Sequence, residues 1–285
     1  MIRRRPEDAL ARHHRDATRL HLVALAALYL LLNLAVAGTP GFLLAAGFLV
    51  VASTGYRLLP AATVLRMHRA RPAPAAVALR LEGLLGPLAR RAGLDRPPEL
   101  WLLPRPEINA LCVQGRDGDA LALSEGALRE CPPRELAAIC AHEFAHVANR
   151  DQAMMQLASY THAVTSTLSA VIVLAAVLSL PLSLVTEVEP PPGTALAAAL
   201  LLPVPSLLVL LSLSRTRELA ADLVAAELLG DARPMAEALA RVARLEAALA
   251  RVRPVLRLPP WLSSHPGHRR RIAHLARAQE LRGWG

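Results

Sequence analysis

Several residue types are scarce in this sequence, and each scarcity narrows the class of protein. The 285 residues contain no lysine, which is typical of a GC-rich genome, and aromatic residues amount to only 3%. The three cysteines form no CxxC pair, and we interpret Cys112, Cys131 and Cys140 as apolar fillers in a reducing compartment. Charge is also absent from three long stretches, at 22–56, 152–186 and 190–214.

These uncharged stretches are rich in Leu, Ala and Val, and hydrophobic residues make up 54% of the sequence. A helix needs about 20 apolar residues to cross the hydrocarbon core of a bilayer. The first stretch has room for a hairpin of two short spans broken at 38–41, and the others predict one span each, at 160–185 and 194–213. We therefore predict four transmembrane helices.

Two alternatives to this arrangement stay open. Some of the apolar segments could be buried helices of a soluble protein. Residues 1–37 also have the basic start and apolar stretch of a cleavable signal peptide. The apolar run resumes at Phe42, which favours an uncleaved hairpin.

Arginine is distributed unevenly around the apolar segments. The connectors between paired spans contain none, whereas arginines precede the first span and follow the second and fourth: Arg3, Arg4, Arg5, Arg12, Arg15, Arg19, Arg57, Arg66, Arg69, Arg71, Arg215 and Arg217. By the positive-inside rule, both termini and the polar middle segment face the cytoplasm. The formal charge of +9 therefore indicates anionic lipid rather than nucleic acid as the partner.

The polar middle segment contains an HExxH motif, in the stretch AICAHEFAHVANRD (138–151). His142 and His146 lie four residues apart, so on a helix both can direct a ring nitrogen at one zinc ion. Glu143 projects about 100° away, where it could accept a proton from a zinc-bound water attacking a peptide carbonyl. The alternative is a partly solvated helical face, but the apolar neighbours predict burial, which requires partners. We interpret Asp151 as a cap of this helix.

A catalytic zinc site needs a third protein ligand. HExxH enzymes of the glutamate type take it from a second helix, often in an ExxxD pattern, and RELAADL (217–223) supplies Glu218 and Asp222 on one helical face. We predict Glu218 as the ligand and Asp222 as the residue that orients a ligand histidine. The alternative is a solvated acidic edge in which Glu218 pairs with Arg215 or Arg217.

Short apolar runs suited to strands occur at 100–103, 110–113 and 120–123, and GRDGD between the last two predicts a hairpin. The other polar regions predict helices at 74–93, 131–151, 214–230, 231–252 and 268–282, with a proline-rich loop at 253–268.

Together, these motifs resemble the HtpX-type membrane zinc metalloproteases, which are relatives of the CAAX prenyl endoprotease. The resemblance extends to INA (108–110), LALSEGAL and SSHPGHRRRI, in the same order along the chain. It implies that Asn109 and Ala110 form an edge-strand motif that aligns the substrate backbone. It also implies that His265 stabilises the oxyanion and that Arg271 belongs to the same catalytic group. Departures at Leu111, Leu219 and Gly267 leave the substrate preference open.

The fold class that follows is a mainly α membrane protein with an α+β zincin-like domain carrying a small sheet. We predict a transmembrane hairpin at 1–59, the first half of the protease domain at 60–156, a second hairpin at 157–213 and the second half at 214–285.

The predicted function is that of a metalloendopeptidase with one zinc ion per chain, multi-pass in a bacterial inner or plasma membrane, with its active site in the cytoplasm. The resemblance implies quality control of misfolded or damaged membrane proteins. One alternative is a sensor-type protease that cleaves a cytoplasmic regulator, although no extracellular ligand-binding domain is present. A second is a non-catalytic membrane scaffold of the same fold. The oligomeric state is left open.

Overall fold

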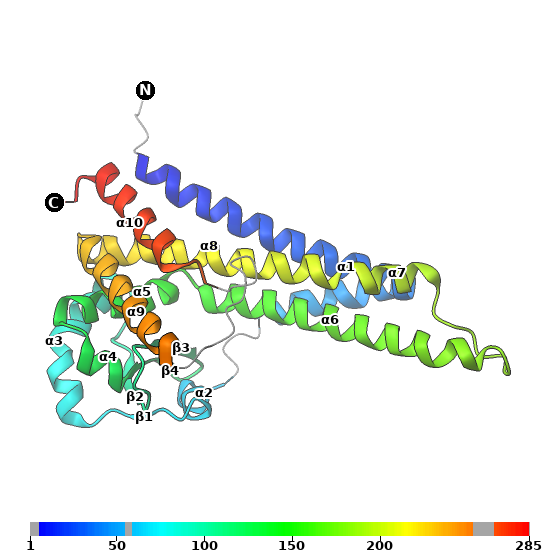
Figure 1. Ribbon diagram of the computed structural model, residues 1–285, viewed down its shortest axis with the longest axis horizontal. Coiled ribbons are helices and arrows are strands. Elements are labelled where there is room, and N and C mark those ends of the chain that lie inside the picture. Colours follow the sequence, from blue (N-terminus) through cyan, green and yellow to red (C-terminus); the bar gives the residue numbers. More distant parts are fainter. Residues whose placement is uncertain (1–5, 55–58, 253–264, 285) are drawn as a thin grey trace. The chain divides into compact units, whose positions relative to one another are not determined.

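The computed structural model describes residues 6–54, 59–252 and 265–284 (Figure 1). Arg3, Arg4, Arg5 and Arg57, which entered the prediction of orientation, lie outside these ranges, as does most of the predicted loop at 253–268. The described chain is mostly helical and contains one small sheet, as the sequence predicts.

Contacts divide the chain into two compact units. One consists of residues 1–14, 57–152 and 215–285, and we call it the protease unit. The other consists of residues 15–56 and 153–214, and we call it the membrane unit. The chain therefore leaves the protease unit after Gln152 and re-enters it at Arg215.

The membrane unit is formed by most of α1 (Pro6–Thr54), α6 (Asp151–Leu182) from its third residue on, α7 (Gly193–Leu201) and the first part of α8 (Pro203–Leu229). Among the described residues, three stretches are long and apolar enough to cross a membrane, at Asp16–Ala52, Asp151–Leu182 and Gly193–Leu229. Many of their apolar side chains are exposed, among them Leu44, Val51, Val177 and Leu201, which suits contact with lipid.

The sequence predicts four spans where the structure gives three candidate stretches. The first stretch is interrupted at the predicted break, since Ala37 and Gly38 depart from helical geometry. Gly38 has φ 60°, which a residue with a Cβ atom rarely adopts. Whether this stretch crosses the membrane twice stays a prediction.

The protease unit contains the sheet, in the order β1-β2-β4-β3 (Figure 1). Its strands are β1 (Arg71–Pro72), β2 (Glu99–Leu103), β3 (Ala110–Gly115) and β4 (Gly118–Ser124). β2 and β4 are parallel, whereas β1 pairs with β2 and β3 with β4 in antiparallel fashion. The predicted hairpin is therefore β3–β4, and β3 lies at the edge of the sheet.

Helices cover both faces of this sheet, and the side chains that alternate between the faces along each strand pack against them. On one face, Leu121 and Leu123 of β4 pack with Phe144. On the other face, Trp101 and Ala122 pack with Leu65. The covering helices are α2 (Ala61–Met67), α3 (Ala75–Arg91), α4 (Glu125–Glu130) and α5 (Pro133–Ala148). The second part of α8, α9 (Arg233–Val252) and α10 (His268–Arg282) complete the unit.

Candidate metal centre

The HExxH motif lies on α5. Pro133 occupies the first turn, where a backbone N–H would have no partner within the helix, so the N–H that proline lacks is not needed. Glu135, also in the first turn, accepts two hydrogen bonds from Arg241 of α9, at 2.5 and 2.8 Å. Phe144 and Cys140 fill the core on one side of the helix. The motif is thus held between the sheet and α9.

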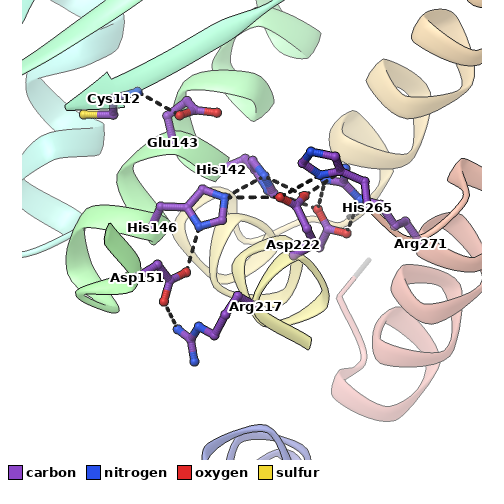
Figure 2. A network of polar contacts seen from close by, with 10 residues as sticks. Cys112, His142, Glu143, His146, Asp151, Arg217, Asp222, His265 and Arg271 are labelled. Carbon is purple, nitrogen blue, oxygen red and sulfur yellow. Dashed lines mark hydrogen bonds and ion pairs between the residues drawn. The ribbon is translucent and has the colours of Figure 1, made fainter. Parts of the chain in front are cut away.

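Three side chains converge on one point: His142 and His146 of α5 and Glu218 of α8. The two Nε2 atoms are 3.1 Å apart. Glu218 lies 3.5 Å from Nε2 of His142 and 3.9 Å from Nε2 of His146. Each of the three residues offers one ligand atom, and these three atoms all lie within 4.8 Å of one another. Figure 2 shows both histidine rings directed into this group.

The spacing of these atoms fits a zinc ion. Two ligand atoms, each about 2.1 Å from a tetrahedral ion, are about 3.4 Å from one another. The three observed separations lie around that value. The donor set of two imidazoles and one carboxylate is also one that zinc binds in catalytic sites. These residues therefore fit the metal that the sequence predicts.

His142 is buried and contacts two carboxylates. Oδ1 of Asp222 lies 3.1 Å from its Nδ1, although this contact is not aligned as a hydrogen bond. Burial alone would lower the pKa of His142, but Asp222 and Glu218 outweigh it and raise the pKa to about 10. The two carboxylates thus favour a positive charge at this ring.

Arg271, from the first turn of α10, lies against the same carboxylates. Its Nε and Nη2 atoms donate to Asp222 at 2.8 and 2.6 Å, and its Nη1 lies 3.1 Å from Glu218. All three guanidinium nitrogens are therefore engaged. Asp222 itself is 0% exposed. This fork holds Asp222 and Glu218 together.

Asp151 is a partner of His146 that the sequence interpretation missed. Its Oδ2 lies 2.7 Å from Nδ1 of His146, and its other oxygen pairs with Arg217. A carboxylate on the second nitrogen of a ligand histidine fixes its tautomer and orientation. Arg150, immediately before Asp151, has φ 57°, and this turn allows Asp151 to reach back to the helix it follows.

Glu143 lies on the side of α5 that faces the sheet. Its Oε2 accepts a hydrogen bond of 2.9 Å from the backbone N–H of Cys112 in β3. The side chain is half-buried. The candidate base is therefore next to the edge strand (Figure 2).

The remaining predicted residues lie around this centre. Nδ1 of His265 is 3.0 Å from Oε1 of Glu218, while its side chain is 65% exposed. The hydrogen bond to Glu218 raises the pKa of His265. Asn109 is exposed and precedes β3, and Ala110 is its first residue. The backbone of Asn109 is fixed by Ser124, through bonds of 2.9 Å in both directions.

An HExxH helix beside an edge strand, with a glutamate from a second helix, is the arrangement of a metallopeptidase. Comparison with known families agrees, since the model of peptidase family M48 matches residues 75–279. The chain belongs to this family and is a metallo-endopeptidase. A metal ion, typically zinc, is implied by that membership.

Curated relatives point the same way. The chain is 36% identical over 216 residues to a protease HtpX homolog of Acaryochloris marina (strain MBIC 11017), covering 68% of this chain and 70% of that protein. It is 33% identical over 230 residues to one of Acidiphilium cryptum (strain JF-5), covering 79% and 77%. A third, of Desulfatibacillum aliphaticivorans, is 32% identical over 237 residues, covering 77% and 75%. No solved structure matched. The resemblance to HtpX-type proteases is confirmed.

Proposed function

We propose that this chain is a membrane-bound zinc endopeptidase in which His142, His146 and Glu218 bind the ion and Glu143 is the general base. The observation that carries the proposal is the convergence of the three ligand atoms, with Glu143 on the same helix as two of them. A zinc ion held by these residues would supply the Lewis acidity that peptide hydrolysis requires.

The side chains around the ion have distinct roles in this proposal. Glu143 accepts the proton of the attacking water and delivers it to the departing amine. Asp222 and Asp151 orient His142 and His146. His265, which is exposed beside Glu218, donates to the developing oxyanion.

The family resemblance implies that Arg271 belongs to the same catalytic group as His265. Its contacts support a different role, since every guanidinium nitrogen is bound to Asp222 or Glu218. In our proposal it is a positioning residue for the ligand set.

The substrate enters as an extended strand. β3 lies at the edge of the sheet, and Asn109 and Ala110 at its start offer backbone groups to a peptide. Addition of a strand to such an edge binds the backbone and leaves side chains to be selected separately. Polypeptides of varied sequence, such as misfolded or damaged membrane proteins, would suit this mode of binding.

The distribution of arginines along the chain supports a location for the protein. The arginines flanking the apolar segments favour a bacterial inner or plasma membrane protein whose termini and active site are cytoplasmic. Four spans and this orientation together would keep the whole protease unit on one side. Cysteine-substituted termini that react with a membrane-impermeant thiol reagent in intact cells would contradict the orientation.

The mechanism is tested with the Glu143→Gln variant of the full chain in detergent. It should retain about one zinc per chain and lose cleavage of casein, because the amide cannot accept the proton. Glu218→Gln should lose metal and activity together. Glu130→Gln, an exposed glutamate of α4, is the matched control and should behave as the wild type. Undiminished cleavage by Glu143→Gln would overturn the assignment.

Two rival functions have their own outcomes. A non-catalytic scaffold predicts no cleavage by the wild type with zinc bound. A sensor-type protease predicts that Glu143→Gln, used as a trap in cells, captures one soluble regulator rather than a range of membrane proteins.

A further inference from the structure

The backbone groups of β3 are not equally available to a substrate. In an antiparallel pair, residues alternate between bonding the neighbouring strand and pointing away from it. Ser124 of β4 donates to the carbonyl of Asn109, so Asn109, Leu111 and Val113 face β4. The N–H and C=O groups of residues 110, 112 and 114 therefore face the open edge.

At Gln114 this edge is already occupied by a side chain. The N–H of Gln114 donates to Oε1 of Gln152 at 2.8 Å, and Nε2 of Gln152 lies 3.5 Å from the carbonyl of Gln114. A glutamine amide has the same donor and acceptor as a peptide group. Gln152 thus takes the place that a residue of an added strand would take.

At Cys112 the situation differs. Its N–H is bonded to the carboxylate of Glu143, which has no hydrogen to donate in return. A substrate carbonyl can replace Glu143 there and release the base for catalysis. For the outward groups of Ala110, the described parts of the chain supply no side-chain partner.

From this contrast we infer that Gln152 closes the substrate-binding edge at Gln114 and limits how many residues before the scissile bond are bound through their backbone. The inference rests on the proposed function. A strand antiparallel to β3 presents to Gln114 a residue two positions N-terminal to the one facing Cys112. For a substrate bound antiparallel to β3 with its scissile bond beside Glu143 at Cys112, the blocked position is on the N-terminal side of the cut.

The fold keeps Gln152 in this place. It follows Asp151 in the first turn of α6, and Asp151 is anchored by Arg217 and His146. Gln114 is only 5% exposed, so its backbone groups need a partner whenever no substrate is bound. Gln152 supplies that partner, so the edge is closed at Gln114 in the folded chain.

The test is a backbone scan of one peptide whose cleavage site has been mapped. In each member of the series a single amide N–H on the N-terminal side, away from the scissile bond, is replaced by an ester oxygen. With the wild type, the ester should matter at one position only. There it should lower kcat/KM by roughly three- to tenfold relative to the all-amide peptide, as expected for one lost hydrogen bond. Gln152→Ala should show a second sensitive position, two residues further towards the N-terminus.

Matched measurements keep the result specific. Gln156→Ala, one turn later on α6, should retain the single position of the wild type. The inference would be overturned if the Gln152→Ala variant showed only the one ester-sensitive position of the wild type. It would also be overturned if the wild type itself showed two such positions, and this measurement does not depend on the folding of a variant. Loss of the proposed function would appear separately, as cleavage that survives Glu143→Gln.

Discussion

Replacement of Arg271 by alanine should lower both the stability of the protease unit and its retention of metal. Arg271 is buried and donates two hydrogen bonds to Asp222, while its third nitrogen contacts Glu218. Asp222 is fully buried, so removal of the guanidinium leaves its carboxylate without the two hydrogen bonds of Arg271. Breaking a buried ion pair by removing one partner costs about 3–5 kcal/mol.

This loss is large enough to measure. For a unit of this size, each 1 kcal/mol lowers the Tm by about 2–4 °C, so Arg271→Ala should unfold about 6–20 °C below the wild type. Arg271→Lys keeps the charge but not the planar fork, and should lie between the two. Thermal unfolding in detergent and the zinc content of the purified protein provide the readouts. Arg269→Ala, an exposed change on the same helix, is the control.

The alternative role of Arg271 gives the opposite pattern. An arginine that acts only on the oxyanion of the substrate would lower kcat when removed and leave the folded protein and its metal intact. An Arg271→Ala variant with the wild-type Tm and one zinc per chain, but a reduced kcat, would refute the positioning role derived from its contacts.

Two further substitutions and one labelling experiment have expected outcomes. Asp151→Asn should weaken zinc binding about 10- to 100-fold in competition with a chelator, because the charge behind His146 is lost; unchanged affinity would contradict this. Burial raises the pKa of Cys131 to about 11, so its thiolate is scarce at pH 8. Iodoacetamide should label it about tenfold faster per pH unit up to that pKa, and fast labelling of the folded protein at pH 8 would argue against burial. Gly126→Ala would place a Cβ 2.0 Å from the carbonyl oxygen of Pro106 and should destabilise the fold by about 1–3 kcal/mol, seen as a lower Tm.

Local patterns were sufficient to predict much of the fold. The helix carrying HExxH has apolar residues on the side that packs in the core, and the hairpin of β3 and β4 is signalled by GRDGD between two apolar runs. Pairing of β2 with β4 depends on contacts distant in sequence, and the two-residue β1 has no pattern of its own.

The candidate site, like the fold, was predictable from local patterns only in part. His142, His146, Glu218 and Asp222 stand at helical spacings that predict their common direction. The contact of Asp151 with His146 depends on a left-handed conformation at Arg150, which its residue type does not favour. The contact between Gln152 and Gln114 joins α6 to the sheet edge, and no spacing within either segment indicates it.

The positions of Asp151 and Arg217 explain how a site can be interrupted by a membrane segment. The chain leaves the protease unit just after Asp151 and returns just before Arg217, and these two buried side chains form an ion pair. The entropy lost in closing a loop grows only with the logarithm of its length, so a long insertion is tolerated if its ends are held together. Asp151 also orients His146, and Glu218 follows Arg217 directly. The contact that closes the insertion therefore lies next to a proposed ligand on each side of it, and a metal ion joining His146 to Glu218 would stabilise the same closure.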